Sequence, residues 1–288
     1  MSLVENISGY RPLKLIAEGG CAEIYQAEDV NSKQHVAIKI LHPQHHQNPN
    51  EHKRLLNEGA LGMRLRHEEY LVKVLKVGQV EKIPYLIMEF APGKTLREIL
   101  RERKKLSDGE VLRMALALAH ALRYLHSQGV YHKDVKPDNI VVNGTHSIKL
   151  LDLGFAESRA RSFFKRFFDN SANKTLEGSP AYLAPELIRT KQASPGTDIY
   201  AMGCTLYECA TGSVPFTGNS EQQIMTKQVD LYRRAPNIGS ISPRISVETQ
   251  RLITRAIEKH PRKRFQTAEE VWLELHRHPA TRHHRTVV

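Results

Sequence analysis

The segment from His132 to Gly154 constrains the fold more than any other part of this sequence. It contains Asp134, Lys136 and Asn139 close together, then a short apolar stretch, and then Asp152. A turn followed by a β-hairpin would bring these four side chains to one place. The chain therefore needs an architecture that holds such a hairpin next to a polar loop.

The residue types in this segment suit phosphoryl transfer from ATP. That reaction needs a carboxylate to orient and deprotonate a hydroxyl, an amide and a second carboxylate to hold Mg²⁺, and a cation near the migrating group. Asp134, then Asn139 with Asp152, and finally Lys136 are residues of these types. The segment therefore indicates a phosphotransferase.

Composition sets the broad class. With 288 residues, of which 40% are hydrophobic and 25% charged, the chain can form one large or two modest domains with a core of normal size. No apolar run approaches the roughly 18 residues of a membrane helix, and residues 1–6 do not resemble a secretory signal. Cys21, Cys204 and Cys209 are too few and too scattered for a disulfide framework or a four-ligand zinc site. We expect a cytoplasmic protein without a transmembrane segment.

The formal charge of +11 raises the question of a nucleic-acid partner. The basic residues are dispersed along the chain, no nucleic-acid motif is present, and there is a single Trp. An enzyme that handles a polyanionic nucleotide also tolerates positive potential. We therefore expect no nucleic-acid partner.

The hydrophobic pattern predicts two parts that meet near residues 91–93. The first is β-rich, with a helix over about 50–66 and strands at 10–18, 24–29, 35–41, 72–80 and 85–89. The second is mainly helical. It has capping-box patterns at Ser107–Glu110 and Thr267–Glu270, and an apolar helix over 199–209.

Three further motifs in the first part agree with nucleotide binding. The turn Ile16–Ile24 contains glycines, which let a backbone approach phosphates closely. The strand Val36–Lys39 ends in a lysine that could reach the α- and β-phosphates, and Glu58 on the predicted helix is its natural partner. Each residue alone would fit a solvated surface position, but their combination favours a nucleotide site.

Together these motifs resemble the eukaryotic-like (Hanks-type) serine/threonine protein kinases, especially the compact bacterial ones. The resemblance covers about Tyr10 to His276. It implies an α+β, bilobal protein-kinase-like fold, with a small β-rich N-lobe at about 10–91 and a larger, mainly helical C-lobe at about 92–276. Residues 1–9 would form an N-terminal extension, and residues 277–288 a flexible tail that is basic and His-rich.

The resemblance also implies catalytic roles. Asp134 would accept or steer the proton of the substrate hydroxyl, and Lys136 would lie near the γ-phosphate. Lys136 is typical of kinases that modify Ser and Thr rather than Tyr. Lys39 and Glu58 would form the ion pair that positions ATP. The implied substrates are proteins, including the chain itself.

For the cofactors, the resemblance implies ATP and Mg²⁺, with Mn²⁺ as an alternative. Asn139 and Asp152 would be the metal ligands, in keeping with the preference of Mg²⁺ for oxygen donors. The implied nucleotide-binding residues are Ile16, Gly19, Ile24, Ala37, Lys39, Met88, Glu89, Ala91 and Val141.

Four residues would support the site. Glu186 and Arg264 resemble the family's buried ion pair at the end of the activation segment. Asp198 resembles the aspartate that hydrogen-bonds the catalytic-loop backbone. His132 would support the same loop instead of acting as a base.

The activation segment leaves several questions open. Lys133 stands where the family usually has an Arg that grips a phosphate, which puts control by phosphorylation in doubt. Thr175 and Ser171 are the candidate phosphosites. The aromatic and basic stretch 159–168 could dock a partner, a second copy of the chain or an anionic membrane, or could pack on the larger lobe.

Two other functions compete with an active protein kinase. A pseudokinase scaffold would bind nucleotide or partners without transfer, as the irregular glycine turn and Lys133 slightly favour. A small-molecule kinase of the same fold is disfavoured by Lys136, by Ala184-Pro185-Glu186 and by Gly178-Ser179-Pro180, which resembles a peptide-binding loop.

Ala17 and Ala22 occupy two positions where the family has glycine, and Gly19 keeps the middle one. We expect both alanines to stay extended, so that the turn closes less tightly over the phosphates. Ala17→Gly and Ala22→Gly should therefore lower the KM for ATP. Steady-state kinetics at varied ATP concentration tests this, and unchanged KM values would contradict it.

Overall fold

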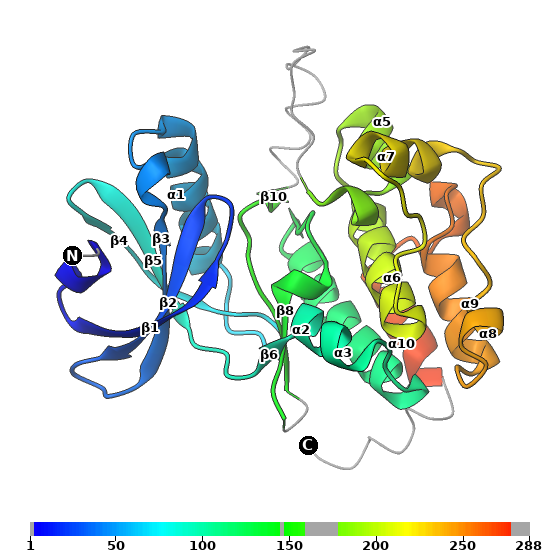
Figure 1. Ribbon diagram of the computed structural model, residues 1–288, viewed down its shortest axis with the longest axis horizontal. Coiled ribbons are helices and arrows are strands. Elements are labelled where there is room, and N and C mark those ends of the chain that lie inside the picture. The colour runs from blue at the N-terminus through cyan, green and yellow to red at the C-terminus, as the bar shows by residue number, and fades with distance from the viewer. Residues whose placement is uncertain (1–2, 145–146, 159–177, 278–288) are drawn as a thin grey trace. The chain divides into compact units, whose positions relative to one another are not determined.

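The computed structural model describes residues 3–144, 147–158 and 178–277, and its contacts divide the chain into two units (Figure 1). The first unit comprises the chain up to Pro92 together with Leu151–Gly154. The second comprises Gly93–Leu150 and the chain from Phe155 onward. The division between Pro92 and Gly93 lies where the sequence pattern changes from β-rich to helical.

The first unit is built on an antiparallel sheet. Its strand order is β1-β2-β3-β5-β4. The strands are β1 (Tyr10–Glu18), β2 (Ala22–Asp29), β3 (His35–Leu41), β4 (Val74–Val80) and β5 (Ile83–Glu89). The predicted strands are confirmed, with β1 and β3 at the predicted bounds and the other three starting within two residues of them. β3 and β5 are central and almost continuously buried, which explains their unbroken apolar runs.

Helix α1 (Pro49–Arg64) packs on this sheet, where it contacts β4 and β5 (Figure 1). Its start is fixed by Asn48, whose side chain accepts the N–H of Asn50. Gly59 and Gly62 let the helix approach closely. A Cβ at Gly59 would come within 2.5 Å of a Leu86 side-chain carbon, and one at Gly62 would lie even nearer to Val74. This close packing places the adjacent Glu58 in the buried face of the helix.

The core of the first unit also draws on residues ahead of the sheet. Val4 and Ile7 are almost fully buried in the same apolar cluster as β3 and β5. Residues 3–9 of the expected N-terminal extension are therefore continuous with this core.

The second unit is mainly helical. Among the described residues, its helices are α2 (Leu96–Arg103), α3 (Asp108–Ser127), α5 (Pro185–Thr190), α6 (Pro195–Thr211), α7 (Glu221–Val229), α8 (Ile238–Ile241), α9 (Val247–Ala256) and α10 (Ala268–Arg277). Helix α6 is buried along nearly its whole length and contacts α3 and α9, while α3 also contacts α10 (Figure 1). This explains why the helix predicted over 199–209 reads as apolar on all sides.

Short strands complete the second unit. One ribbon has the order β6 (Lys94–Thr95), β8 (Ile140–Val142), β9 (Ile148–Leu150), and another pairs β7 (Val130–Tyr131) with β10 (Glu157–Ser158). β8 and β9 form the hairpin that the opening segment predicts. None of the helices in the described ranges is long and apolar enough to cross a membrane.

The two predicted capping boxes differ in outcome. At the start of α3, the Glu110 carboxylate accepts the N–H of Ser107 at 2.8 Å, so this box is confirmed. At the start of α10, the Thr267 hydroxyl accepts the N–H of Glu270. The Glu270 carboxylate, however, accepts from Gln266, one residue before the predicted donor.

Candidate active site

A buried ion-pair cluster lies within the first unit. The Lys39 ammonium, on β3, is 2.8 and 2.9 Å from the two carboxylate oxygens of Glu58 on α1. It is also 2.8 Å from Oδ1 of Asp152. The structure thus brings together the predicted pair and adds a second carboxylate to it.

The charges in this cluster depend on one another. Burial disfavours a charged Lys39, but Asp152 and Glu58 outweigh burial and raise the pKa of its ammonium. Burial raises the pKa of the Glu58 carboxyl to about 7, although Lys39 opposes the shift. Lys39 therefore stays charged at neutral pH.

Asp152 has an unusual backbone. Its φ is +61°, in the left-handed region that non-glycine residues seldom adopt. Its Oδ1 also accepts the N–H of Gly154 at 2.9 Å, and the Leu153 side chain next to it is buried. Such backbone geometry is found where the surroundings hold a side chain in a required direction.

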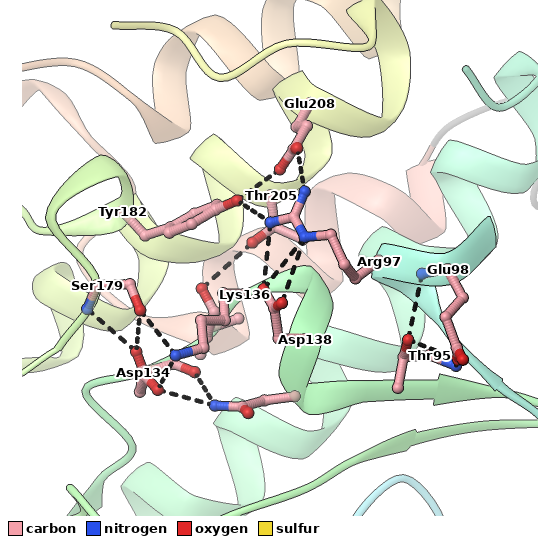
Figure 2. Close-up of polar contacts among 12 residues, drawn as sticks. Thr95, Arg97, Glu98, Asp134, Lys136, Asp138, Ser179, Tyr182, Thr205 and Glu208 are labelled. Atoms are coloured by element: carbon pink, nitrogen blue, oxygen red, sulfur yellow. Dashed lines mark hydrogen bonds and ion pairs between the residues drawn. The ribbon is translucent and has the colours of Figure 1, made fainter. Parts of the chain in front are cut away.

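A second polar cluster, in the second unit, surrounds the Asp134 carboxylate (Figure 2). Its Oδ2 is 2.7 Å from the Lys136 ammonium and accepts Nδ2 of Asn139 at 2.9 Å. Its Oδ1 accepts both the N–H and the hydroxyl of Ser179 at 3.2 Å. Asp134 is only 3% exposed, so these contacts fix both of its oxygens.

The sequence had not indicated a role for Ser179. Its hydroxyl also lies 2.7 Å from the Lys136 ammonium, which donates to it. One hydroxyl is therefore held by both a carboxylate and an ammonium (Figure 2). The signal available beforehand was the Gly178-Ser179-Pro180 motif, but nothing in that motif pointed to Asp134.

The residues predicted as metal ligands carry suitable donor atoms. Asp152 supplies a carboxylate, and its side chain is 32% exposed. Asn139 donates its Nδ2 to the Asp134 carbonyl and carboxylate, so its amide oxygen is the atom that could coordinate a cation. Oxygen donors of this kind fit Mg²⁺ or Mn²⁺.

The loop carrying Asp134 depends on Asp198 of α6. Its carboxylate accepts the backbone N–H of His132 at 2.9 Å and of Lys133 at 2.8 Å, and Nε2 of His126 lies 2.8 Å away. Asp198 is fully buried, yet hydrogen bonds from these groups outweigh burial and hold its pKa below the ordinary range. The expected contact of Asp198 with the loop is therefore present, with His126 as an unforeseen partner.

The side chain of His132 supports the loop that carries Asp134 through a hydrogen bond. Its Nδ1 accepts the N–H of Asp134 at 3.3 Å, and the residue is fully buried. This contact joins the imidazole to the backbone of the loop that carries Asp134.

Glu186 and Arg264 form the expected bidentate pair. Each terminal nitrogen of the Arg264 guanidinium is 2.6 Å from one Glu186 oxygen. Arg264 is 1% exposed and also donates to the carbonyls of Gly196 and Glu258. The pair ties α5 to the start of α6 and to the chain ahead of α10.

Lys133 has a partner that the sequence had not suggested. Its ammonium is 3.2 Å from the Glu157 carboxylate, and both residues are buried. Glu157 lies on β10, which pairs with β7 just before Lys133. Thr175, Ser171 and the stretch 159–168 lie outside the described residues.

Most of the predicted nucleotide-binding residues of the first unit lie on its sheet. Ala37 faces Met88 and Val36 faces Glu89 in the pairing of β3 with β5. Ile16 on β1 is exposed, Ile24 on β2 is partly buried, and Ala91 follows β5. Val141, on β8, belongs to the second unit.

The glycine turn joins β1 to β2. Ala17 and Ala22 lie in these strands and keep extended backbones, as expected. The N–H of Gly19 donates to the Ala22 carbonyl at 2.9 Å. Burial and Glu51 raise the pKa of the Cys21 thiol, which argues against the redox-sensitive thiolate that a phosphate-binding turn could favour.

Asp198→Asn should destabilise the chain by about 1–3 kcal/mol, because asparagine has one acceptor oxygen instead of two and leaves buried donors unsatisfied. A carboxyl with a depressed pKa contributes stability above its unfolded pKa of about 3.9 and loses it as the pH falls through the folded value. The variant should therefore lose stability at neutral pH and show a weaker acid dependence.

Urea unfolding at several pH values measures both effects. Glu248→Gln, at an exposed carboxylate on α9, is the matched control. Equal stability of Asp198→Asn and the control at pH 7 would contradict the proposed support of the loop.

Comparison with known proteins agrees with this geometry. The family model described as "Protein kinase domain" matches residues 10–278. A probable serine/threonine-protein kinase of Corynebacterium efficiens is 32% identical over 271 residues, which cover 90% of this chain and 40% of that protein. A probable serine/threonine-protein kinase of Clostridium acetobutylicum is 32% identical over 266 residues, which cover 92% of this chain and 39% of that protein.

Serine/threonine-protein kinase PknB of Mycobacterium tuberculosis is 31% identical over 268 residues, covering 91% of this chain and 41% of PknB. The chain thus spans about two fifths of the length of these bacterial relatives. The α+β fold, with its five-stranded sheet and its helical second unit, agrees with the family match. The chain belongs to the protein kinase domain family.

Proposed function

We propose that this chain is an ATP- and Mg²⁺-dependent protein kinase that transfers the γ-phosphoryl group to Ser and Thr hydroxyls of proteins, itself included. The observation that carries the proposal is the position of the Ser179 hydroxyl, which lies 3.2 Å from Asp134 and 2.7 Å from Lys136. A carboxylate and an ammonium that hold one hydroxyl have the chemistry needed to hold an acceptor hydroxyl.

In the proposed reaction, Asp134 orients the acceptor hydroxyl and takes its proton as the oxygen bonds to the γ-phosphorus. The bond from that phosphorus to the β–γ bridging oxygen breaks, and ADP keeps the electron pair. Lys136 offsets the negative charge on the transferring group. Asn139 holds Asp134 in place through its Nδ2.

Lys39 would bind the α- and β-phosphates, and Glu58 would keep its ammonium in position. Both residues are buried, and their contacts of 2.8 and 2.9 Å limit the directions in which the ammonium can point. Asp152 and Asn139 would hold Mg²⁺, which would offset the negative charge of the phosphates. Mn²⁺ is an alternative ion.

The adenine pocket is proposed from the resemblance. The backbones of Glu89 and Ala91 would hydrogen-bond the base, with Met88 beside them as gatekeeper. The apolar residues Ile16, Ile24, Ala37 and Val141 would sandwich it, and Gly19 would lie over the phosphates.

Two observations weigh against the competing functions. A pseudokinase scaffold has no need for the contacts that join Lys39 to Glu58 or Asp134 to Lys136, yet both pairs are present. A small-molecule kinase would not need the segment after Gly178 to interact with Asp134, whereas Ser179 makes two hydrogen bonds to it.

Purified chain incubated with labelled ATP, Mg²⁺ and a generic basic protein should transfer label, and Asp134→Asn should abolish nearly all of it. The asparagine keeps the shape of the side chain but cannot accept a proton, a role that typically contributes about 10²–10⁴-fold to the rate. Asp29→Asn, at the end of β2, is the matched control and should keep full transfer.

Each outcome separates one function from the others. Nucleotide binding without transfer by the wild-type chain would favour the scaffold. Transfer only to small molecules would favour a small-molecule kinase. Equal transfer by Asp134→Asn and wild type would refute the role of Asp134.

We also propose that the chain phosphorylates itself on Thr175 or Ser171. The buried pair of Lys133 and Glu157 suggests that this phosphate is not needed to neutralise Lys133. After incubation with ATP and Mg²⁺, mass spectrometry should find phosphate on one of the two residues in the wild type and none in Asp134→Asn. Active protein with both residues unmodified would contradict the proposal.

A further inference from the structure

Arg97 joins three separate elements of the second unit (Figure 2). It lies on the first turn of α2, and its Nε and Nη2 donate to the Asp138 carboxylate at 3.1–3.3 Å. Nη1 donates to Oε1 of Glu208 on α6, and Nη2 lies 2.7 Å from the Tyr182 hydroxyl. The Tyr182 hydroxyl in turn donates to Oε2 of Glu208 at 2.6 Å.

The partners of Arg97 adjoin the catalytic cluster on both sides. Asp138 stands between Lys136 and Asn139 in the loop that carries Asp134. Tyr182 closes the 3₁₀ turn Pro180–Tyr182, which follows Ser179 directly. Arg97 therefore connects the loop that holds Asp134 with the segment that holds Ser179.

The chemistry of this network depends on a guanidinium. Burial disfavours the charge of Arg97, but the hydrogen bonds to Asp138 and Glu208 outweigh it and raise its pKa. Burial and the Glu208 charge raise the pKa of Tyr182, so its hydroxyl stays protonated and can donate. A planar fork reaches three partners in different directions, whereas a lysine offers a single point of charge.

Without Arg97, this network would contain two carboxylates and no cation. Glu208 is 7% exposed and Tyr182 is 6% exposed, so water could not easily replace the guanidinium there. Glu208 would then be a buried carboxylate without its cation, and the guanidinium that links Asp138 of the loop to Tyr182 of the neighbouring segment would be lost.

We propose that Arg97 is a positioning residue, which fixes the Asp134 loop against the Ser179 segment and thereby orients the catalytic carboxylate toward the acceptor hydroxyl. The inference rests on the proposed phosphoryl transfer and adds to it a residue that contacts neither Asp134 nor Ser179 among the hydrogen bonds described. Its loss should slow the chemical step and leave ATP binding, which is assigned mostly to residues of the first unit, largely unchanged.

The test compares Arg97→Met with Arg97→Lys and with Arg103→Met. Arg103 lies on the same helix and pairs with Glu110 at an exposed position, which makes it the matched control. Arg97→Met should lower kcat by about 10- to 100-fold, because small displacements of reacting groups have effects of this size. The KM of Arg97→Met for ATP should change less than about twofold. The kcat of Arg97→Lys should lie between those of Arg97→Met and the wild type, and Arg103→Met should have the kcat of the wild type.

A second comparison distinguishes positioning from general stability. Glu208→Gln combined with Arg97→Met removes the buried carboxylate that Arg97→Met leaves without a cation, so the double variant should have a higher kcat than Arg97→Met alone. Tyr182→Phe, which removes only the bridging hydroxyl, should lower kcat less than Arg97→Met does. Circular dichroism and Tm measured on each variant give the folded fraction at the assay temperature.

If Arg97→Met does not fold, Arg97→Lys and Tyr182→Phe provide the same kcat-against-KM comparison. A wild-type kcat in folded Arg97→Met would overturn the inference. If Arg97→Met does not fold, a wild-type kcat in both Arg97→Lys and Tyr182→Phe would overturn it. So would a loss of activity that only follows the folded fraction. An inactive wild type would overturn the proposed function itself, which makes the two failures distinguishable.

Discussion

The loop that carries Asp134 depends on one buried carboxylate, that of Asp198. The loop has no regular secondary structure at His132 and Lys133, so their backbone N–H groups need partners other than a helix or sheet. Asp198 accepts both of them from within α6, the most buried helix of the second unit. Other helices hold α6 on several sides, so the hydrogen bonds from Asp198 fix the position of the loop. These contacts also hold the left-handed backbone of Lys133 in place.

Each unit assembles its own group of charges. In the first unit, the ammonium of Lys39 is balanced by Glu58 and Asp152. In the second, Asp134 is balanced by Lys136, and Asp138 with Glu208 by Arg97. Every buried charge in these groups has a partner of opposite sign, as burial requires. The candidate site is therefore preorganised within each unit by contacts that the structure describes.

Local patterns predicted much of this arrangement. Alternating or continuous apolar runs predicted the five strands, and a serine followed three residues later by a glutamate predicted the start of α3. The pair of Lys39 with Glu58 followed from the motifs that carry them. Ser179, Arg97 and Glu157 were not assigned roles, because a single polar residue in a loop, helix or short strand has no periodic signal that names its partner.

The sequence by itself determined which elements form and which residues bring charge to the segment from His132 to Gly154, because these depend on neighbours within a few positions. Only the tertiary structure decided the long-range partners that no family motif indicates. Lys133 pairs with Glu157, and Arg97 reaches Glu208 across 111 positions of chain. Such pairs depend on how helices and loops pack, since hydrogen bonding acts over a few ångströms regardless of separation along the chain.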